Sequence, residues 1–348
     1  MKVLNLLREN IKQLSPYSSA RDEYSGVEGV FLDANENPIG STTAGAEFNR
    51  YPDPIQWKLK QKIAKLKSVS PEQIFLGNGS DEAIDLLVRM FCEPKKDNII
   101  ILPPTYGMYK VCADIQDIEI RKVNLIPEIF QIDVNKVLGT IDSHSKIIWV
   151  CSPNNPTGND IKASDIELLL KQFDGVVVVD EAYIDFTDVP SFVEKLSQYD
   201  NLVILQTFSK AWGLAALRMG MAFANPELIT IFNKVKYPYN INEATQTFVM
   251  NALTNEAVKN KHVEEMLATK DVLEKALLQL SFVQKTYPSS ANFILVKVDD
   301  PRGIYEYLIK DLIIIRDRSQ VVLCEGCLRI SIGTVEENKL LIKRLYDF

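Results

Sequence analysis

The stretch VVVVDEAY occupies residues 176–183 and places an acidic residue directly after four consecutive valines. A β-branched run without polar alternation is typical of a strand that helices cover on both faces. At the end of such a strand the carboxylate of Asp180 is costly unless a cationic partner compensates it. An ordinary ion-paired or helix-capping aspartate remains the alternative. The stretch predicts a central strand of an α/β sheet with a chemically unusual side chain at its carboxyl end.

Short strand-like runs recur on both sides of this stretch, and segments with helical spacing separate most of them. They lie at Ile74–Leu76, Asn98–Leu102, Ile118–Val123, Ile147–Cys151, Leu202–Gln206 and Met219–Ala224. From residue 147 onward they recur at intervals close to the size of a crossover unit. The alternation predicts a mostly parallel, doubly wound sheet from about residue 45 to 250.

The pattern changes after Ala244, where one long helical stretch is predicted to run to Leu280. Further strands and helices are then expected at Phe282–Lys285, Asn292–Val298, Gly303–Lys310, Ile313–Arg316, Leu328–Ile332 and Glu336–Tyr346. We therefore expect an N-terminal arm (1–30), a large α/β domain (31–255) and a small C-terminal α+β domain (256–348).

Composition excludes several classes of protein. The chain has 348 residues and is 46% hydrophobic and 24% charged, which is ordinary for a globular protein. Its formal charge of −7 offers no basic excess for a nucleic acid or an anionic membrane, so we expect neither as a partner. Only two histidines are present, His144 and His262, so a histidine-rich zinc site cannot be built and no metal is expected.

Cysteine usage and the N-terminus indicate a cytoplasmic protein. Five cysteines are an odd and sparse set that argues against a disulfide framework and for a reducing compartment. Cys324 and Cys327 lack a second ligand pair, so strand or turn thiols are the simpler interpretation. Arg8 and Glu9 interrupt the N-terminus before a signal-peptide core could form, and no run approaches 18 apolar residues.

Five polar or glycine-rich motifs follow predicted strands, and ligands of open α/β sheets bind beyond the carboxyl ends of the strands. The motifs are GNGSDE (77–82), PPTYG (103–107), SPNNPTG (152–158), DEAY (180–183) and TFSK (207–210). Each has an ordinary structural explanation by itself. Together they predict one crevice that contains a lysine, an aspartate, an asparagine, two tyrosines and a loop suited to a phosphate.

Two of these motifs indicate specific chemistry. In GNGSDE, Ser80 is expected to cap a helix whose free N–H groups suit an anion, although a third glycine of a dinucleotide fingerprint is missing at Glu82. Lys210 ends a buried strand. A solvated surface lysine is the ordinary alternative, but a lysine in a desolvated crevice becomes a usable amine nucleophile.

Three motifs in combination carry a resemblance to a known family: SPNNPTG, DEAY and the pattern S-K-x-x-G-L-A-x-L-R at residues 209–218. With them the chain resembles the fold-type-I aminotransferases that depend on pyridoxal phosphate. LDANENP (32–38), NRYPDP (49–54), IIIRDRS (313–319) and CLRISIGT (327–334) are similar to the histidinol-phosphate branch. The resemblance implies a mostly parallel seven-stranded sheet flanked by helices, with a smaller α+β domain.

The resemblance also implies how the crevice would hold the cofactor. Lys210 would bind the cofactor aldehyde and act as the general base, while Asp180 would pair with the pyridine nitrogen. Around the ring, Asn155 and Tyr183 would bond the phenolic oxygen and Tyr106 would stack on the ring face. The cofactor phosphate would contact Gly79, Ser80, Asp81, Ser209 and Arg218, together with Tyr51 from a partner subunit, which implies a homodimer.

Substrate contacts are implied in the same way. Arg329 would clamp an anionic group, Arg316 would assist with a substrate phosphate, Tyr17 would close over that phosphate, and Asn35 would also contact the substrate. For either arginine alone, a solvated strand-end residue is the ordinary alternative.

The implied reaction exchanges an amino group between histidinol phosphate and 2-oxoglutarate in histidine biosynthesis, giving imidazole-acetol phosphate and glutamate. Related chemistry stays open, because an aromatic or broad-range aminotransferase or an amino-acid-phosphate decarboxylase would share Lys210, Asp180 and Asn155. A non-catalytic binding protein on the same fold is the alternative from another class, and a Rossmann-type dehydrogenase is a third.

Overall fold

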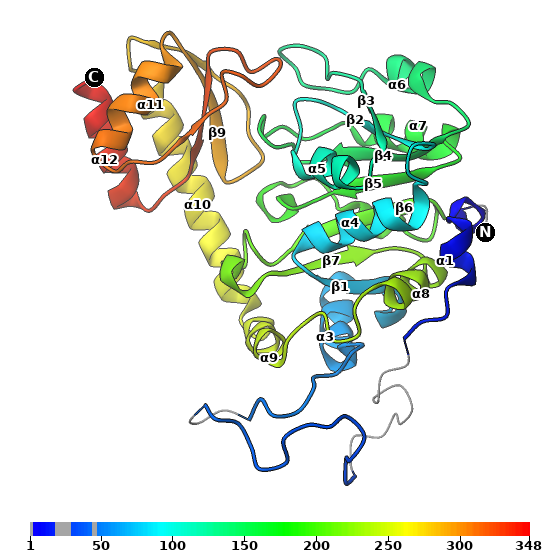
Figure 1. Ribbon diagram of the computed structural model, residues 1–348. Helices are drawn as coiled ribbons and strands as arrows, with labels where there is room; N and C mark the ends of the chain where they lie inside the picture. Colours follow the sequence, from blue (N-terminus) through cyan, green and yellow to red (C-terminus); the bar gives the residue numbers. More distant parts are fainter. Residues whose placement is uncertain (1–2, 18–28, 44–46) are drawn as a thin grey trace.

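The computed structural model describes residues 3–17, 29–43 and 47–348. Its larger sheet has seven strands in the order β1-β7-β6-β5-β4-β2-β3 (Figure 1). The strands are β1 (Ile74–Asn78), β2 (Asn98–Ile101), β3 (Glu119–Lys122), β4 (Ser145–Cys151), β5 (Val176–Asp180), β6 (Leu202–Thr207) and β7 (Met219–Phe223). Each coincides with a predicted strand to within two residues at either end.

Strand direction confirms the mostly parallel sheet. The five strands β6, β5, β4, β2 and β3 pair in parallel, while β7 runs antiparallel to both of its neighbours, β1 and β6. The parallel strands therefore end at a common edge, and the loops that follow them are brought together there.

Helices cover both faces of this sheet. They are α1 (Glu9–Gln13), α3 (Trp57–Lys67), α4 (Ser80–Phe91), α5 (Met108–Ile115), α6 (Val134–Thr140), α7 (Ala163–Gln172), α8 (Pro226–Val235) and α9 (Glu243–Ala252). Residues of α3, α6, α7 and α9 form one core cluster, and residues of α1, α4, α5 and α8 form the other. In β5, Val177 and Val179 belong to the first cluster and Val176 and Val178 to the second, so β5 is buried on both faces as its sequence predicts.

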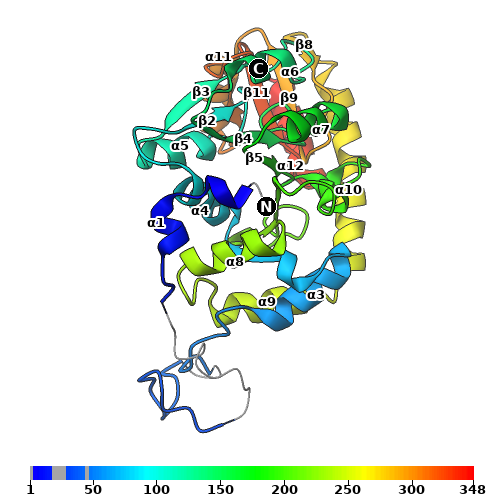
Figure 2. The same ribbon diagram turned by 90° about the vertical axis from the view of Figure 1, so that its right-hand side faces the viewer.

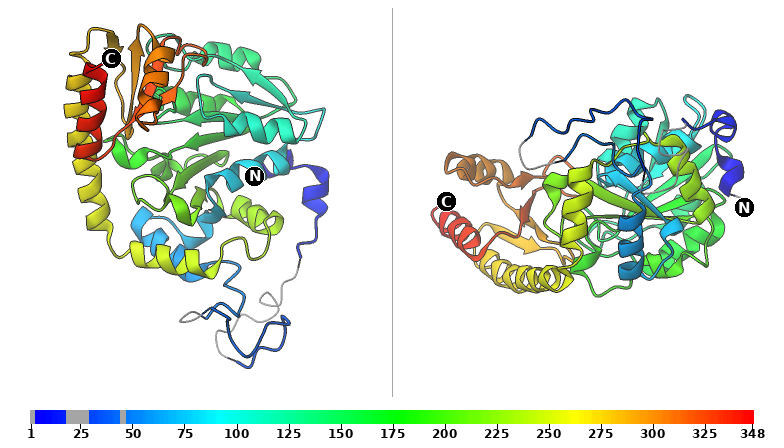
Figure 3. Two further views of the ribbon diagram at one scale, coloured as in Figure 1. Left: turned by 60° about the vertical axis from the view of Figure 1, so that its left-hand side comes forward. Right: turned by 90° about the horizontal axis from the view of Figure 1, so that it is seen from below.

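Short helical turns complete the connections of the large sheet. They are η1 (Val3–Leu6), η2 (Pro71–Gln73), η3 (Ile184–Phe186), η4 (Phe192–Lys195) and η5 (Ala215–Leu217). Near the N-terminus, Val3, Leu7 and Ile11 are buried in the same cluster as α4 and α8. Residues 29–43 and 47–52 instead extend away from the body of the molecule (Figures 1 and 3). Val30, Leu32 and Ile39 in this extension are 89%, 85% and 93% exposed.

A second sheet has four antiparallel strands in the order β10-β11-β9-β8. Its elements are α10 (Glu256–Leu277), β8 (Val283–Thr286), β9 (Phe293–Val298), α11 (Pro301–Lys310), β10 (Arg316–Asp317), β11 (Cys327–Ser331) and α12 (Val335–Tyr346). The sheet shares a hydrophobic core with α10, α11 and α12 (Figures 1 and 2). The domain bounds at residues 30 and 255 stay predictions.

The structure corrects two element predictions. The strand predicted at Ile313–Arg316 is shorter and later, because the chain turns at Leu312, with φ of 59°, and pairing with β11 begins only at Arg316. The single helix predicted after Ala244 is two helices, α9 and α10. The Thr254 hydroxyl and the Asn255 side-chain amide both donate to the Asn251 carbonyl, at 2.7 and 3.3 Å, and close the end of α9.

Within the ranges that the structure describes, every helix is too short or too polar to cross a membrane.

Trp149 in β4 provides a test of the core. It is fully buried and stacks on Tyr109 with ring centroids 4.7 Å apart, and its Nε1 has no hydrogen-bond partner. We expect Trp149→Ala to lower the free energy of unfolding by about 3–5 kcal/mol. Trp149→Phe keeps aromatic packing and removes an unpaired donor, so its loss should be less than about half of that. Urea titration measures both, and equal losses would contradict the packing assigned to Trp149.

Candidate active site

A cavity of 530 Å³ lies at the carboxyl ends of β1, β2, β4, β5 and β6 and extends to the strand pair β10 and β11. Its walls include twelve of the predicted site residues: Gly79, Ser80, Asp81, Tyr106, Asn155, Asp180, Tyr183, Ser209, Lys210, Arg218, Arg316 and Arg329. These residues come from positions between 79 and 329, so the topology of the two sheets brings them together.

Asp180 ends β5 and is 3% exposed. Its carboxylate accepts hydrogen bonds from the Tyr109 hydroxyl at 2.6 Å and the Ala182 amide at 3.1 Å. Burial raises the pKa of Asp180 to about 6, and the two hydrogen bonds oppose that rise. The cationic partner expected from the sequence is absent among the described residues, since Lys210 acts on Asp180 only through its field.

Tyr109 is a functional residue that the sequence analysis missed. It lies on α5, is fully buried, and stacks on Trp149 while its hydroxyl donates to Asp180. Burial raises its pKa well above the ordinary value, and Asp180 raises it further, so Tyr109 remains a hydrogen-bond donor. No sequence signal connects Tyr109 to Asp180, because the two are 71 residues apart.

Lys210 faces Asp180 and Tyr183 across the cavity, with its Nζ 5.5 Å from the centre of the Tyr183 ring. Its side chain is accessible from the cavity, but the protein atoms around it displace much of the water that would otherwise solvate the ammonium group. This burial lowers the pKa of Lys210, and the positive charge of Arg329 lowers it further. Compared with a lysine of ordinary pKa, a larger fraction of Lys210 is therefore neutral and able to attack a carbonyl carbon or to transfer a proton.

The N-terminus of α4 forms an anion cradle with Arg218. Gly79 has φ of 76°, and a Cβ added there would lie 2.7 Å from Arg218 Nη2. A Cβ on Gly220 of β7 would overlap the Ser80 amide nitrogen, so both glycines permit the close approach of β7 and α4. The helix end therefore presents its N–H groups and a guanidinium to the same side of the cavity.

Ser80 does not cap α4, which corrects the prediction from the sequence. Gly79 holds the N-cap position without a side-chain hydrogen bond, and Ser80 is the first helical residue. Asp81 beside it accepts from the Tyr106 hydroxyl at 3.0 Å and lies 3.6 Å from Arg218. These contacts position Tyr106 and Arg218 at the cradle.

The two asparagines of the loop after β4 have different surroundings. Asn154 is 1% exposed and donates to the Pro104 carbonyl at 2.8 Å and the Thr157 hydroxyl at 2.6 Å, so it is structural. Asn155 lines the cavity, and its side-chain oxygen accepts from Arg329. The loop thus joins the large sheet to β11.

An aromatic contact joins Tyr183 to the second sheet. The Phe293 ring of β9 meets the Tyr183 ring edge-on at 5.3 Å and lies under the Arg329 guanidinium at 5.1 Å. Val263 of α10 is buried in the same cluster. Burial raises the pKa of Tyr183, while Arg329 lowers it.

Three arginines from the strand pair β10 and β11 and from the residue that follows β10 line the cavity: Arg316, Arg318 and Arg329. Arg318 was not predicted, although its spacing of two from Arg316 would place both side chains on one face of a strand. Burial lowers the pKa of Arg329, and repulsion from Arg318 and Arg316 lowers it further.

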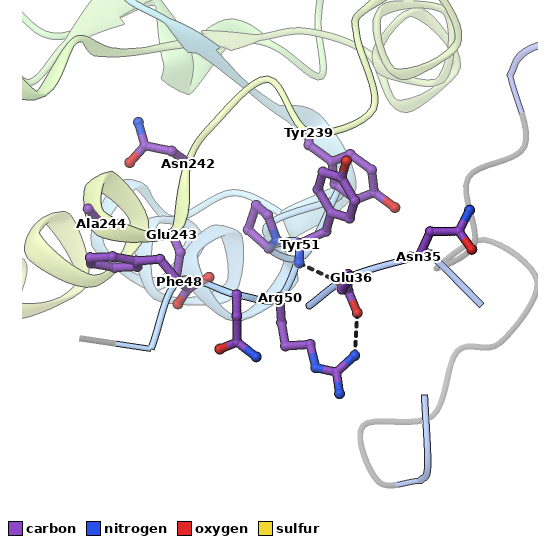
Figure 4. A pocket seen from close by; sticks show the side chains of 12 residues that line it. Asn35, Glu36, Phe48, Arg50, Tyr51, Tyr239, Asn242, Glu243 and Ala244 are labelled. Atoms are coloured by element: carbon purple, nitrogen blue, oxygen red, sulfur yellow. Dashed lines mark hydrogen bonds and ion pairs between the residues drawn. The ribbon is translucent and has the colours of Figure 1, made fainter. Parts of the chain in front are cut away.

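Three predicted substrate or cofactor residues lie outside this cavity. Asn35 and Tyr51 line a separate pocket formed by the extension, where Tyr51 stacks on Tyr239 at 4.4 Å and its amide donates to Glu36 at 2.6 Å (Figure 4). Tyr17 is 76% exposed. Within one copy of the chain these three do not meet Lys210.

The residues of the cavity fit pyridoxal phosphate, the cofactor that the resemblance implies. Lys210 offers an amine for its aldehyde, Asp180 a carboxylate for its ring nitrogen, and the cradle at Gly79 a site for its phosphate. Thr105 Oγ1 and Arg329 Nε, on residues that line the cavity, are buried without a partner in the described part of the chain. The wall thus retains hydrogen-bonding capacity for a polar ligand.

Known proteins resemble this chain over nearly its whole length. Residues 25–345 match the family model described as aminotransferase class I and II. A histidinol-phosphate aminotransferase from Cytophaga hutchinsonii is 54% identical over 344 residues, covering 99% of this chain and 98% of the relative.

Solved structures share the fold at lower identity. A histidinol-phosphate aminotransferase from Sinorhizobium meliloti in complex with pyridoxal-5'-phosphate superposes with a TM-score of 0.80 at 21% identity, covering 98% of this chain and 96% of that one. An L-threonine-O-3-phosphate decarboxylase from Porphyromonas gingivalis has a TM-score of 0.73 at 24% identity, with coverages of 86% and 91%. The fold is thus common to transaminases and decarboxylases, but the match over 321 of 348 residues and the 54% identity decide the family: the chain belongs to the class I and II aminotransferases.

Proposed function

We propose that this chain is a pyridoxal-phosphate-dependent transferase that exchanges an amino group between histidinol phosphate and 2-oxoglutarate in histidine biosynthesis. The observation that carries the proposal is the 54% identity, over 99% of the chain, to a histidinol-phosphate aminotransferase. The cavity supports it, because its walls carry a lysine, a buried aspartate and three arginines of the second sheet and its hairpin.

The cofactor, when bound, supplies an electron-withdrawing ring that stabilises negative charge on the α-carbon of the substrate. Lys210 would hold the aldehyde of the cofactor through Nζ. Burial lowers the pKa of Lys210, so its free amine would be able to move a proton at the α-carbon of the substrate. Asp180 would pair with the ring nitrogen and keep it protonated, and the Tyr109 hydroxyl holds this carboxylate in place.

The other wall residues bind and orient. Asn155 and Tyr183 would donate to the phenolic oxygen of the ring, and Tyr106 would pack on its face. Gly79, Ser80 and Asp81 would offer backbone amides to the cofactor phosphate, which Ser209 and Arg218 would also contact. Arg329 and Arg316 would bind the anionic group of the substrate.

A second copy of the chain is part of this proposal. Tyr51 cannot reach the cavity of its own chain and would contact the cofactor phosphate of a partner, which makes the active unit a homodimer. Tyr17 and Asn35 are proposed as substrate contacts, with Tyr17 covering the substrate phosphate. The domain bounds 31–255 and 256–348 and a cytoplasmic location belong to the same proposal.

A coupled assay tests the reaction. Given histidinol phosphate and 2-oxoglutarate, the purified protein should form glutamate with release of no carbon dioxide. A protein that instead releases carbon dioxide from a phosphorylated amino acid is a decarboxylase. Faster turnover of aromatic amino acids than of histidinol phosphate would identify a broad-range aminotransferase.

The role of Lys210 is tested by absorbance. The wild-type protein should carry a visible band from lysine-bound cofactor, and Lys210→Ala should lose that band and nearly all activity, by at least about a thousandfold. Lys58→Ala, on the exposed side of α3, is the matched control and should keep both. A band that persists in Lys210→Ala contradicts the assignment.

Asp180→Asn should separate stability from activity. The pKa of Asp180 is raised from 3.8 to about 6, so its ionised form destabilises the cofactor-free fold by about 3 kcal/mol above pH 6. This penalty fades as the pH falls from 6 to 3.8, and below pH 3.8 the side chain is protonated in both the folded and the unfolded state. The variant should therefore be more stable than wild type at pH 8 but not at pH 4, with activity lower by at least about a hundredfold.

Thermal unfolding of the cofactor-free proteins at the two pH values measures this difference. The exposed Asp188→Asn is the control. A stability gain that is equal at both pH values would show that burial of the Asp180 charge is not its cause.

Mixed dimers test the partner contact of Tyr51. Lys210→Ala lacks the amine, and Tyr51→Phe should weaken cofactor binding by about tenfold. A heterodimer of the two would contain one site with both wild-type residues, so mixing at limiting cofactor should restore activity that neither variant has alone. Failure to recover activity, or full activity in a protein that sediments as a monomer, rejects the contact.

A further inference from the structure

Arg316, Arg318 and Arg329 lie on one face of the strand pair β10 and β11. Arg316 is directly opposite Arg329 in the register, and the Arg318 amide donates to the Cys327 carbonyl at 2.9 Å, which continues the pairing by one position. Asp317 alternates to the other face, opposite the buried Leu328. All three guanidinium groups therefore belong to the cavity side, and all three residues line the cavity.

The backbone that carries Arg318 is held firmly. The Val321 amide donates to the Arg318 carbonyl at 2.8 Å, and the Ser319 amide donates to the Asp317 side chain at 2.8 Å. Cys324 and Cys327 are buried in the core beneath this hairpin and are free thiols. The pair of cysteines thus anchors the hairpin by packing, and Arg318 is placed on a rigid element.

In the described part of the chain, two of the three arginines are held by neutral acceptors: Arg329 donates to the Asn155 side-chain oxygen and Arg318 to the Asp317 carbonyl at 3.4 Å. Arg316, Arg318 and Arg329 form no ion pair within residues 3–17, 29–43 and 47–348. Of the two acidic side chains that line the cavity, Asp81 lies 3.6 Å from Arg218 and Asp180 is bonded to Tyr109. Burial and repulsion from Arg316 both lower the pKa of Arg318, as expected for cations that lack a counter-charge.

Two arginines are sufficient for a carboxylate, which carries a single negative charge and accepts two parallel hydrogen bonds. A phosphate monoester carries between 1.5 and 2 negative charges at about neutral pH and has three acceptor oxygens. A third guanidinium is therefore matched to the phosphate rather than to the carboxylate.

We propose that Arg318 is a specificity-determining residue that contacts the phosphate of the amine substrate and favours a phosphate monoester over a carboxylate at this wall of the cavity. The inference rests on the proposed function, because it assigns a phosphorylated amine as one substrate and glutamate as the other. Arg329 serves both substrates, whereas Arg318 serves the phosphorylated one.

The two half-reactions of the holoenzyme, followed separately in single turnovers, test this assignment. Arg318→Gln should lower kcat/KM for histidinol phosphate by about 10- to 100-fold, mainly through KM, and change that for glutamate by less than about threefold. Arg318→Lys keeps the charge without the planar fork and should recover part of the loss. Arg302→Gln, an exposed arginine of α11 paired with Glu306 at 2.6 Å, is the matched control.

Inorganic phosphate provides a readout that does not depend on the amine. It should inhibit the glutamate half-reaction of the wild-type holoenzyme competitively, with an inhibition constant that Arg318→Gln raises by about tenfold and Arg302→Gln leaves unchanged. Equal losses for both amines, or an unchanged inhibition constant, would overturn the role of Arg318. A wild-type protein that turns over glutamate but not histidinol phosphate refutes the proposed function, and the inhibition constant then still decides whether Arg318 binds phosphate.

Discussion

The carboxylate of Asp180 lies at the end of a strand that the protein buries on both faces, and the rest of the site is arranged around it. Its charge is compensated by a tyrosine hydroxyl and a backbone amide rather than by a cation. Burial therefore raises the pKa of Asp180 to about 6. The carboxylate consequently keeps a strong tendency to pair with a group that carries a proton. Above pH 6 the fold thus holds a buried anion that a cationic ligand in the cavity could neutralise.

Two walls of the cavity are built by different means. The wall with Lys210 and Asp180 is formed by loops that follow parallel strands, so its residues meet because those strands end at one edge. The wall with the three arginines comes from an antiparallel strand pair, where alternation and register align them on one face. Phe293 contacts both walls, through Tyr183 and Arg329, so movement of the second sheet changes both environments together.

The sequence predicted those parts of the fold that depend on local pattern. Runs such as Val176–Val179 are apolar and β-branched at every position, which is typical of strands of a covered sheet. Motifs after the strands identified the cavity, because the carboxyl ends of parallel strands lie together. The strand around Ile313 was misplaced, since three isoleucines have high strand propensity but only pairing with β11 decides where a strand begins.

Other features could not be predicted because their partners are distant in sequence. Tyr109 acquires its role from Asp180, and the end of α4 is shaped by the approach of Gly220 rather than by Ser80. Arg318 could have been predicted, because a spacing of two in a strand places it on the same face as Arg316. Tyr51 lies in a pocket outside the active-site cavity of its own chain, and its proposed partner contact stays a prediction.

Five basic and two acidic side chains line the cavity of a chain whose net charge is −7. The field that an anionic substrate meets therefore changes sign with distance. At physiological ionic strength, charges are screened beyond about 8 Å. The net negative charge of the chain therefore does not attract an anionic substrate from a distance, and the arginines act on the substrate only once it has entered the cavity. Added salt should then weaken the bound contacts while reducing repulsion at a distance, so affinity and association rate respond to ionic strength in opposite directions.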